Sequence, residues 1–338
     1  MRSYILRAGS SSLDDLVLVE RDEPRPGTRE VLIQVRACSL NFRDQAVMTG
    51  NYFGGKVPHD QVPLSDGAGE VVEVGSGVTK FKPGDRVQST FFLKWSNGPP
   101  RPDCGPATGA PGAPGLLTEY VVLPEEAVTP MASNLSFEEA ATLPCAGVTA
   151  WNGLAYGAAP LRPGQDVLLL GTGGVSILAL QIAAAAGTNI VITSSSDEKL
   201  ERAKALGAKV GINYREVEEW GTAAAGAFGR PGVDKVIEVG GFGTLPMSMQ
   251  AVGWGGEIAM IGVLTRGGDT TPHILMLKGA SLRGIMVGSR AMAAALNRAI
   301  EASDIHPVID KVFPFEEAAE AYRYQATPEL FGKVVIRI

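Results

Sequence analysis

The stretch from Leu168 to Gly187 reads LLLGTGGVSILALQIAAAAG and joins an apolar strand, a glycine-rich turn and an apolar helix. Gly171 would let the chain turn tightly, and Gly173 would let backbone N–H groups approach a pyrophosphate. The dipole of the following helix favours the negative charge of such a group. The stretch therefore predicts a dinucleotide-binding turn; the alternative is a tight turn that binds no ligand.

The turn departs from the usual glycine pattern at its third glycine, where this chain has Ser176. Serine is small, so the helix can still pack closely against the strand. We expect the turn to contact the cofactor through Gly171, Gly173, Gly174 and Val175.

On both sides of this turn the apolar runs are continuous rather than alternating, which is typical of parallel strands covered by helices on both faces. These runs are DVLLLG, NIVITSSS, VGINY, VDKVIEVGG, GEIAMIGV and SLRGIMVG. The sequence therefore predicts an α/β fold with an open, doubly wound parallel sheet.

The chain before residue 130 has a different pattern, in which short β-branched runs are broken by Pro and Gly. This pattern predicts a β-rich domain of antiparallel strands. The Pro/Gly-rich segment 96–115 is expected to be a surface loop. The last fifty residues return to mixed patterning, so the expected domains are 1–130 with 288–338, and 131–287.

The choice of dinucleotide depends on the end of the second strand, where an Asp or Glu would bind the ribose 2'-OH of NAD. Ser194 and Ser195 occupy that place, and the first carboxylate is Asp197, which a helix start explains as well. Hydroxyl groups together with Lys199 would accept a 2'-phosphate. NADP(H) is therefore favoured over NAD(H), although Lys199 is also consistent with a solvated helix lysine.

The composition of the chain indicates which kinds of partner and which cellular compartment to expect. The 36 acidic and 30 basic residues give a net charge of -6, which argues against nucleic acid and anionic membranes as partners. No apolar run approaches the roughly 18 residues that a membrane helix needs. The three cysteines form no CxxC motif and suit a reducing compartment, so we expect a cytoplasmic protein with a small-molecule ligand.

Further motifs occur in a consistent order along nearly the whole chain: EVLIQVRACSLNFRD, PLSDGAGEVVEVGSGVTKFKPGDRV, GLLTEYVVLP, LPCAGVTAW and VLLLGTGGVS. Together they resemble the medium-chain dehydrogenase/reductase superfamily. The resemblance implies a GroES-like β-rich catalytic domain and a Rossmann coenzyme domain.

Zinc-dependent members of this family bind a catalytic metal through residues that this chain has replaced. Asn41 stands where a cysteine ligand is found, and Ser65 stands where a histidine is found. Only Cys145 matches a third ligand of some members. Because tight zinc binding takes about three N, S or carboxylate ligands, we expect no zinc. Oxygen ligands from Asp44 and Asp66 are the alternative.

Without a metal, oxidation of an unactivated alcohol is difficult, whereas a quinone or a conjugated enone already accepts hydride. Zinc-free members of the family include NADPH-dependent quinone and enone or alkenal reductases, so the resemblance implies that activity. We then expect Asn41 to donate a hydrogen bond to the acceptor oxygen or to the nicotinamide ribose, and Asp44 to orient that segment. Tyr52 matches an aromatic position near the substrate in the similar quinone reductases, where it would stack on the acceptor or deliver a proton. The competing interpretations are turn, helix-cap and packing roles for the same three residues.

The remaining cofactor contacts come from two sources. The resemblance implies Thr149 beside the nicotinamide and Tyr214 against the adenosine phosphate. The carboxyl edge of the parallel sheet, where a dinucleotide should run, predicts Gly240, Val263 and Leu264. The resemblance further implies a homodimer through the sixth strand, SLRGIMVG. A zinc-type alcohol dehydrogenase with a degenerate metal site and a non-catalytic dinucleotide-binding protein are the alternative functions.

Overall fold

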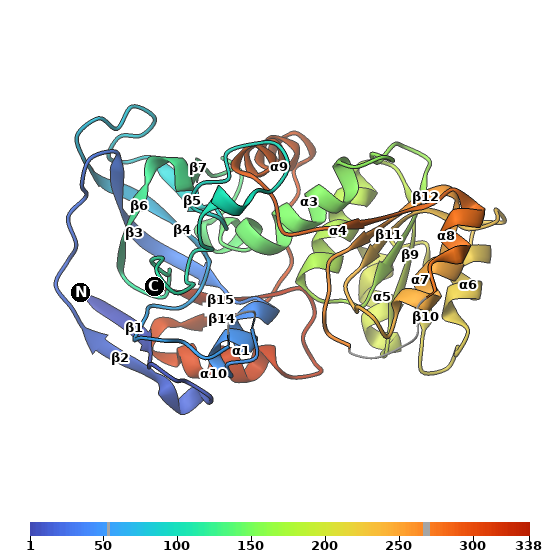
Figure 1. Cartoon of the computed structure of the whole chain (residues 1–338), viewed down its shortest axis with the longest axis horizontal. Helices are drawn as coiled ribbons and strands as arrows, with labels where there is room; N and C mark the ends of the chain where they lie inside the picture. The colour runs from blue at the N-terminus through green and yellow to red at the C-terminus, as the bar shows by residue number, and fades with distance from the viewer. Residues whose placement is uncertain (53–54, 266–270) are drawn as a thin grey trace. The chain divides into compact units, whose positions relative to one another are not determined.

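The computed structural model describes residues 1–52, 55–265 and 271–338 (Figure 1). The chain divides into two compact units: a first unit of Met1–Val148 with Gly288–Ile338, and a second unit of Thr149–Val287. The sequence placed the first boundary at residue 130. The first unit extends beyond it because α2 (Phe137–Ala140) packs against strands of that unit.

The second unit contains a six-stranded parallel sheet in the order β10-β9-β8-β11-β12-β13. Its strands are β8 (Asp166–Leu170), β9 (Asn189–Ser194), β10 (Val210–Asn213), β11 (Val233–Glu238), β12 (Val252–Met260) and β13 (Ser281–Gly284). The order reverses between β8 and β11, which is the topological switch point where open α/β sheets bind ligands. The predicted doubly wound Rossmann fold is confirmed.

Helices connect these strands on both faces of the sheet. They are α3 (Val148–Ala155), α4 (Gly174–Ala185), α5 (Asp197–Ala205), α6 (Trp220–Gly226), α7 (Leu245–Ala251) and α8 (His273–Lys278). From β8 the chain proceeds through β9 to β10 at one edge of the sheet. From β11 it proceeds through β12 to β13 at the opposite edge. Because crossovers are right-handed, α4 and α5 cover one face while α7 and α8 cover the other. This double cover explains why β8 is buried at every position.

The first unit is built on a sheet of mainly antiparallel strands in the order β14-β15-β3-β4-β5-β7, with β6 also paired to β3. Its strands are β3 (Glu30–Ser39), β4 (Asp66–Val74), β5 (Arg86–Ser89), β6 (Tyr120–Pro124), β7 (Val128–Pro130), β14 (Ile309–Pro314) and β15 (Lys333–Arg337). The hairpin of β1 (Arg2–Leu6) and β2 (Leu16–Glu20) is a separate two-stranded sheet. This architecture confirms the predicted β-rich, GroES-like domain.

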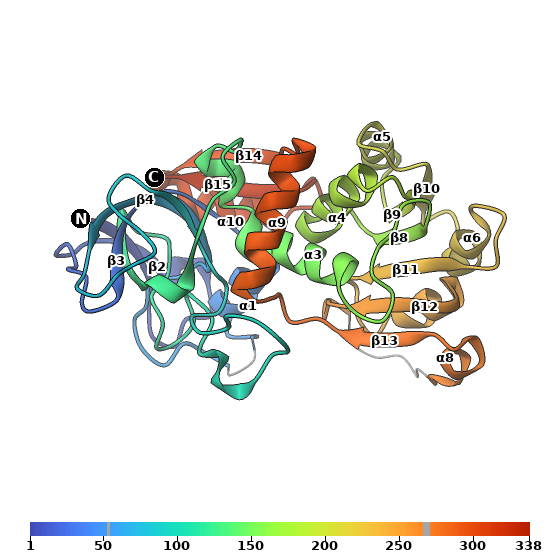
Figure 2. The same cartoon turned by 90° about the horizontal axis from the view of Figure 1, so that it is seen from above.

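The C-terminal segment rejoins the first unit as the sequence predicted, because β15 pairs antiparallel with β3 (Figure 2). Besides α2, the unit contains the helices α1 (Phe42–Met48), α9 (Arg290–Ser303) and α10 (Ala318–Gln325) and a π-helical turn (Leu143–Gly147). No helix in the described ranges has both the length and the apolar character that a membrane span requires.

The segment 96–115 is only in part the surface loop that its composition predicts. Thr108 is fully buried, and its hydroxyl donates a hydrogen bond to the Thr90 carbonyl oxygen at 2.9 Å. Gly115 lies so close to the Val62 carbonyl that an added Cβ would stand 2.0 Å from it. Part of the loop therefore forms a wall of the first unit.

Candidate active site

The ends of neighbouring strands bring a buried polar cluster together in the first unit. At the end of β3, Ser39 pairs with Asp66 of β4 and with Val335 of β15. Helix α1 begins directly after β3, so its first turn lies at the same end of the sheet. We call five buried residues the polar cluster: Asn41, Arg43, Asp44, Asp66 and Lys333.

Lys333 determines how the Asn41 amide is oriented. Its ammonium donates hydrogen bonds to the Leu40 carbonyl oxygen at 2.5 Å and to Asn41 Oδ1 at 2.7 Å. An ammonium cannot accept a hydrogen bond, so the amide must present its oxygen to Lys333. The buried Nδ2 makes no hydrogen bond of good geometry among the described residues, although the Asn41 amide is close enough to Asp66 to help lower the pKa of that carboxyl. Asn41 Nδ2 is thus a buried donor, and its role toward a substrate or cofactor stays a prediction.

Asp44 links the cluster to the start of α1. Its carboxylate accepts a hydrogen bond from the Asn41 backbone N–H at 2.7 Å, as in a helix-capping pair. Burial raises the pKa of Asp44 to about 6, although the nearby Arg43 guanidinium opposes the shift. The capping interpretation describes this contact, and the orienting role remains a proposal.

Asp66 is held by groups that fix both of its carboxylate oxygens. The Ser65 hydroxyl donates to Oδ1 at 2.6 Å, and the Cys145 backbone N–H donates to Oδ2 at 3.0 Å. Burial raises the pKa of Asp66, and the nearby Lys333 ammonium opposes the shift. Burial also raises the pKa of the Cys145 thiol, with Asp66 as a further cause. Cys145 is therefore a neutral thiol in this environment.

These residues do not fit a zinc ion. Asn41 Oδ1 already accepts a hydrogen bond from the Lys333 ammonium, whose positive charge repels a metal ion at this position, and the amide offers no anionic ligand. In the described ranges no three His, Cys, Asp or Glu side chains are grouped so that they could hold a metal ion. A zinc-independent reaction remains our prediction on the chemistry of these donors.

Arg43 is a cluster residue that the sequence analysis missed. Its guanidinium carbon lies 5.4 Å from the ring centroid of Tyr52 and 5.1 Å from that of Phe91. Nη1 donates a hydrogen bond to the Thr108 carbonyl oxygen at 3.1 Å. Burial raises the pKa of Tyr52. The motif LNFRD offered a signal, since it places an arginine between two predicted site residues.

The glycine turn of the second unit has the geometry that a pyrophosphate requires. Gly171 adopts φ +69°, and Gly173 is the N-cap of α4 with no side chain over the helix end. A Cβ added to either glycine would meet no atom within 4 Å, so there is room above the turn. The Ser176 hydroxyl donates to the Leu170 carbonyl oxygen at 2.6 Å, which ties the helix to β8. These features, with Gly174 and Val175 in the first turn of α4, fit a dinucleotide.

The end of β9 presents hydroxyl groups instead of a carboxylate. Ser194 is buried, and Ser195 is half-buried. The first acid, Asp197, accepts a hydrogen bond from Asn213 Nδ2 at 2.9 Å and so has a structural partner. Lys199 lies in the first turn of α5, and Tyr214, which follows β10, is 45% exposed.

A second missed residue, Glu238, orders the loop after β11. Its buried carboxylate accepts hydrogen bonds from the N–H groups of Gly240 at 2.7 Å and Gly241 at 2.9 Å. It also accepts from the hydroxyl groups of Thr244 and Ser248. In the sequence Glu238 is only the last residue of a predicted strand. In the structure its carboxylate fixes the loop that contains Gly240, a predicted cofactor residue.

The last predicted cofactor residues lie at two places in the second unit. Thr149 is buried in the first turn of α3. Val263 and Leu264 follow β12, and both are 51% exposed. Such exposure of apolar side chains is consistent with a surface that a ligand covers.

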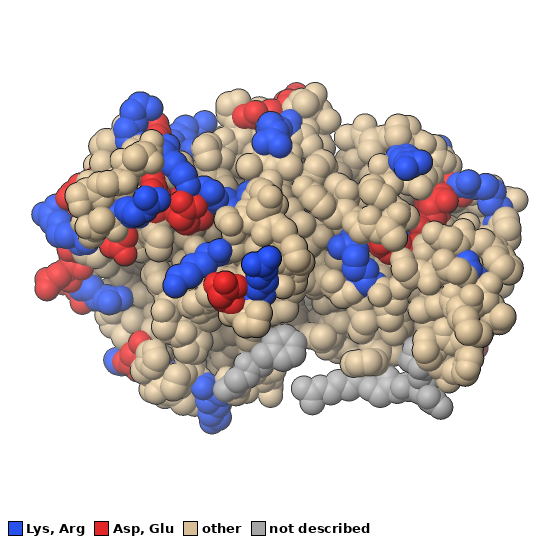
Figure 3. All heavy atoms as spheres, turned by 45° about the horizontal axis from the view of Figure 1, so that its top comes forward, with Lys and Arg blue, Asp and Glu red and all other residues tan. Residues whose placement is uncertain are grey.

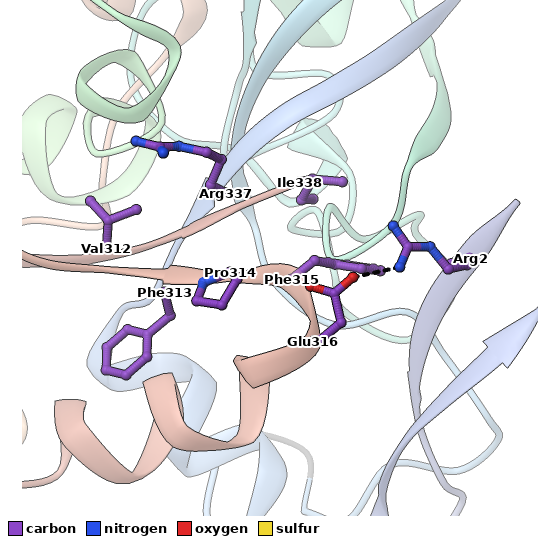
Figure 4. A pocket seen from close by; sticks show the side chains of 8 residues that line it. All are labelled: Arg2, Val312, Phe313, Pro314, Phe315, Glu316, Arg337 and Ile338. Carbon is purple, nitrogen blue, oxygen red and sulfur yellow. Dashed lines mark hydrogen bonds and ion pairs between the residues drawn. The ribbon is translucent and has the colours of Figure 1, made fainter.

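A shallow pocket elsewhere in the first unit contains none of these residues (Figure 4). Its two arginines already have partners, because Arg2 pairs with Glu119 and Glu316, and Arg337 pairs with Glu138. We assign it no ligand. On the face drawn in Figure 3 basic and acidic side chains are interspersed, a distribution that does not favour an extended polyanion such as nucleic acid.

The fold combines a GroES-like unit with a unit that contains a Rossmann-type parallel sheet. Family models described as "Alcohol dehydrogenase GroES-like domain" and "Zinc-binding dehydrogenase" match residues 27–133 and 174–302. The chain belongs to the medium-chain dehydrogenase/reductase superfamily.

Three similar proteins illustrate the range of names within the family. A zinc-type alcohol dehydrogenase-like protein of Schizosaccharomyces pombe is 45% identical over 99% of both chains. A quinone oxidoreductase of Sus scrofa is 30% identical over 88% of this chain and 86% of its own. The crystal structure of a protein from Sinorhizobium meliloti 1021, described as an alcohol dehydrogenase, has 39% identity and a TM-score of 0.90 with complete coverage of both chains.

Proposed function

We propose that this protein is an NAD(P)H-dependent reductase that transfers a hydride to a quinone or to a conjugated enone or alkenal without a metal. The observation that carries the proposal is the Lys333–Asn41 contact, which leaves a buried amide donor where zinc-dependent relatives hold their metal. A reaction of this kind needs a preorganised donor for the negative charge that develops on the acceptor oxygen. The quinone oxidoreductase among the relatives supports the same class of acceptor.

The chemistry divides between the cofactor and the chain. When bound, a nicotinamide supplies the hydride, and a proton from solvent completes the reduction of a quinone to a hydroquinone or of an enone to a ketone. Asn41 Nδ2 would donate a hydrogen bond to the acceptor oxygen, and Asp44 would keep the Asn41 backbone in place. Tyr52 would pack against a planar acceptor.

The preference for NADP(H) over NAD(H) is part of the proposal. Its support is the absence of a carboxylate at the end of β9 in the described structure, where Ser194 and Ser195 stand ahead of Lys199. A 2'-phosphate is attracted by a cation and by hydroxyl donors, whereas a carboxylate would repel it. Equal or higher affinity for NADH than for NADPH would contradict this preference.

The proposal is tested by one paired assay. The oxidation of NADPH and of NADH is followed with 1,4-benzoquinone and with 3-penten-2-one, each with and without a strong chelator. We expect turnover that prefers NADPH and does not change with chelator. Activity restricted to an alcohol or aldehyde and abolished by chelator would overturn the proposal.

A zinc-type alcohol dehydrogenase is the second candidate, and the name of the relative with 45% identity favours it. Metal analysis of protein purified without chelator separates the two, because the candidate requires about one zinc per chain. A non-catalytic dinucleotide-binding role is the third alternative. It would show as cofactor binding with no turnover of any of the acceptors.

We further propose a cytoplasmic homodimer that pairs through β13. This strand lies at the end of the six-stranded sheet, and Leu282 on it is 40% exposed. Edge strands of this kind are templates for pairing with a second copy. Light scattering coupled to size exclusion should report the mass of a dimer, and a monomer at micromolar concentration would contradict it.

A further inference from the structure

Arg43 has hydrogen-bonding capacity that the fold does not use. The residue is only 6% exposed, and Nε and Nη2 are buried without a hydrogen-bond partner in the described ranges. Nη1 is held by a neutral carbonyl group, that of Thr108. The nearby Asp44 carboxylate offsets part of the buried charge, and Tyr52 is also a close neighbour. Two buried N–H groups without an acceptor still cost free energy, which a ligand that accepts from both would recover.

The surroundings hold the guanidinium group in place and leave one edge of it unused. The rings of Tyr52 and Phe91 lie within cation–π distance of the guanidinium, which stabilises the buried charge. With Nη1 anchored to the Thr108 carbonyl, the unused donors are Nε and Nη2, which lie side by side on the planar group. This pair of N–H groups is one of the two edges by which arginine binds a carboxylate with two parallel hydrogen bonds.

From these contacts we propose that Arg43 binds a carboxylate group of the substrate through Nε and Nη2. The substrate would then be a conjugated acceptor that also carries a carboxylate, such as a 4-oxo-2-enoate. A neutral carbonyl oxygen would satisfy the donors less well, because it cannot accept two parallel bonds or balance the positive charge. This inference rests on the proposed reductase function and names the acceptor class for the same site.

The two unpaired donor groups then have separate tasks. Asn41 Nδ2 would serve the carbonyl oxygen on which negative charge develops, and Arg43 would hold the other end of the acceptor. Tyr52 and Cys145 are half-buried, whereas the donor atoms of Asn41 and Arg43 are buried, so the proposed acceptor would enter past these two side chains. Arg43 thus acts in substrate binding and positioning.

The test compares 4-oxo-2-pentenoate with its methyl ester, which has the same enone but no negative charge. We expect wild-type kcat/KM for the acid to exceed that for the ester by at least about tenfold. In Arg43→Gln this ratio should fall by at least about tenfold, mainly through the KM of the acid. Arg43→Lys keeps the charge but loses the paired donors, so its ratio should lie between the two.

A readout that does not need turnover completes the test. The saturated acid 4-oxopentanoate should raise the Tm of the wild type and leave the Tm of Arg43→Gln unchanged, because only the wild type offers the paired donors. Arg298→Gln is the matched control, since Arg298 is exposed on α9 and outside the cluster. It should behave as the wild type in both experiments.

The outcomes separate the two proposals. Wild-type reduction of the ester and of 1,4-benzoquinone without a preference for the acid would overturn the Arg43 proposal and leave the reductase function intact. If no acceptor is reduced, the proposed reductase function is wrong. The Tm shift then tests by itself whether Arg43 binds a carboxylate. If Arg43→Gln does not fold, the acid-to-ester ratio and the Tm shift of the wild type remain decisive.

Discussion

Replacing Asn41 by Asp removes one hydrogen-bond donor from the site while it keeps the shape of the side chain. A carboxylate at this position can still accept the hydrogen bond that Lys333 donates to Asn41 Oδ1 at 2.7 Å. The Nδ2–H group, which makes no hydrogen bond of good geometry in the described ranges, is lost. The substitution therefore separates the catalytic role of the amide from its structural role.

The magnitude follows from these contacts. Loss of one preorganised donor to a developing oxyanion costs about 3–4 kcal/mol, so kcat/KM for 1,4-benzoquinone should fall by about 100- to 1,000-fold. The free energy of unfolding should change by only about 1 kcal/mol near pH 6, because the ion pair with Lys333 and a proton on Asp44, whose pKa is about 6, together offset the new charge. Steady-state kinetics and urea unfolding measure the two effects.

Asn41→Leu is the matched control for this prediction. Leucine has neither donor nor acceptor, so Lys333 loses one of its two oxygen partners as well. Its free energy of unfolding should fall by about 1–3 kcal/mol in addition to the loss of activity. If Asn41→Asp instead kept kcat/KM within about threefold of the wild type, the amide would not be the donor and the reasoning would be wrong.

Three further predictions follow from single residues. The pKa of Asp44 rises from 3.8 to about 6 on folding, so its contribution to stability is present below about pH 4 and is lost as the pH rises through 6. Urea unfolding at pH 4 and at pH 7 measures how much the free energy of unfolding falls between these two values. In Asp44→Asn this fall should be smaller than in the wild type by up to about 3 kcal/mol. Lys199→Glu should lower the NADPH-to-NADH ratio of kcat/KM at least about tenfold, and an unchanged ratio would exclude a contact with the 2'-phosphate. Gly173→Ala meets no atom within 4 Å, so the fold should be kept while cofactor affinity, measured by NADPH fluorescence, falls. Unchanged affinity would show that no phosphate approaches this position.

The form of the glycine turn could be predicted from the sequence because its determinants are local. Gly171, Gly173 and Ser176 stand within one strand, turn and helix, and the left-handed φ of Gly171 is a property of its own turn. The same holds for Asn41 and Asp44, which are three residues apart at a helix start.

Lys333 and Arg43 could not be predicted in the same way, because their roles depend on contacts between distant segments. Lys333 is an ordinary charged residue at a strand start until β15 pairs with β3 and buries it beside Asn41. Arg43 depends on Phe91 and on Thr108, a residue of the segment that the composition predicted to be a surface loop. Glu238 is similar, since its partners lie in the loop and helix that follow it.

The charges of the polar cluster connect the Arg43 proposal with the unusual pKa of Asp44. Two cationic groups, Arg43 and Lys333, face two carboxylates, Asp44 and Asp66. The uncharged titratable groups around Asp44 are Cys38, Tyr52, Cys145 and Tyr322. A bound substrate carboxylate would add a third negative charge, and a proton on Asp44 is the compensation that requires the smallest change, because its pKa is already about 6.

Binding of an acidic acceptor should therefore be accompanied by uptake of a proton, whereas binding of its ester should not. On this argument the acid-to-ester ratio of kcat/KM increases as the pH falls from 8 to 6, and it does so less in Asp44→Asn, which cannot take up the proton. A ratio that stays constant over this range in the wild type would mean that the acceptor carboxylate is not bound near Asp44. Because Arg43 lies beside Asp44, such a result would contradict carboxylate binding by Arg43 even if the tenfold preference for the acid were observed.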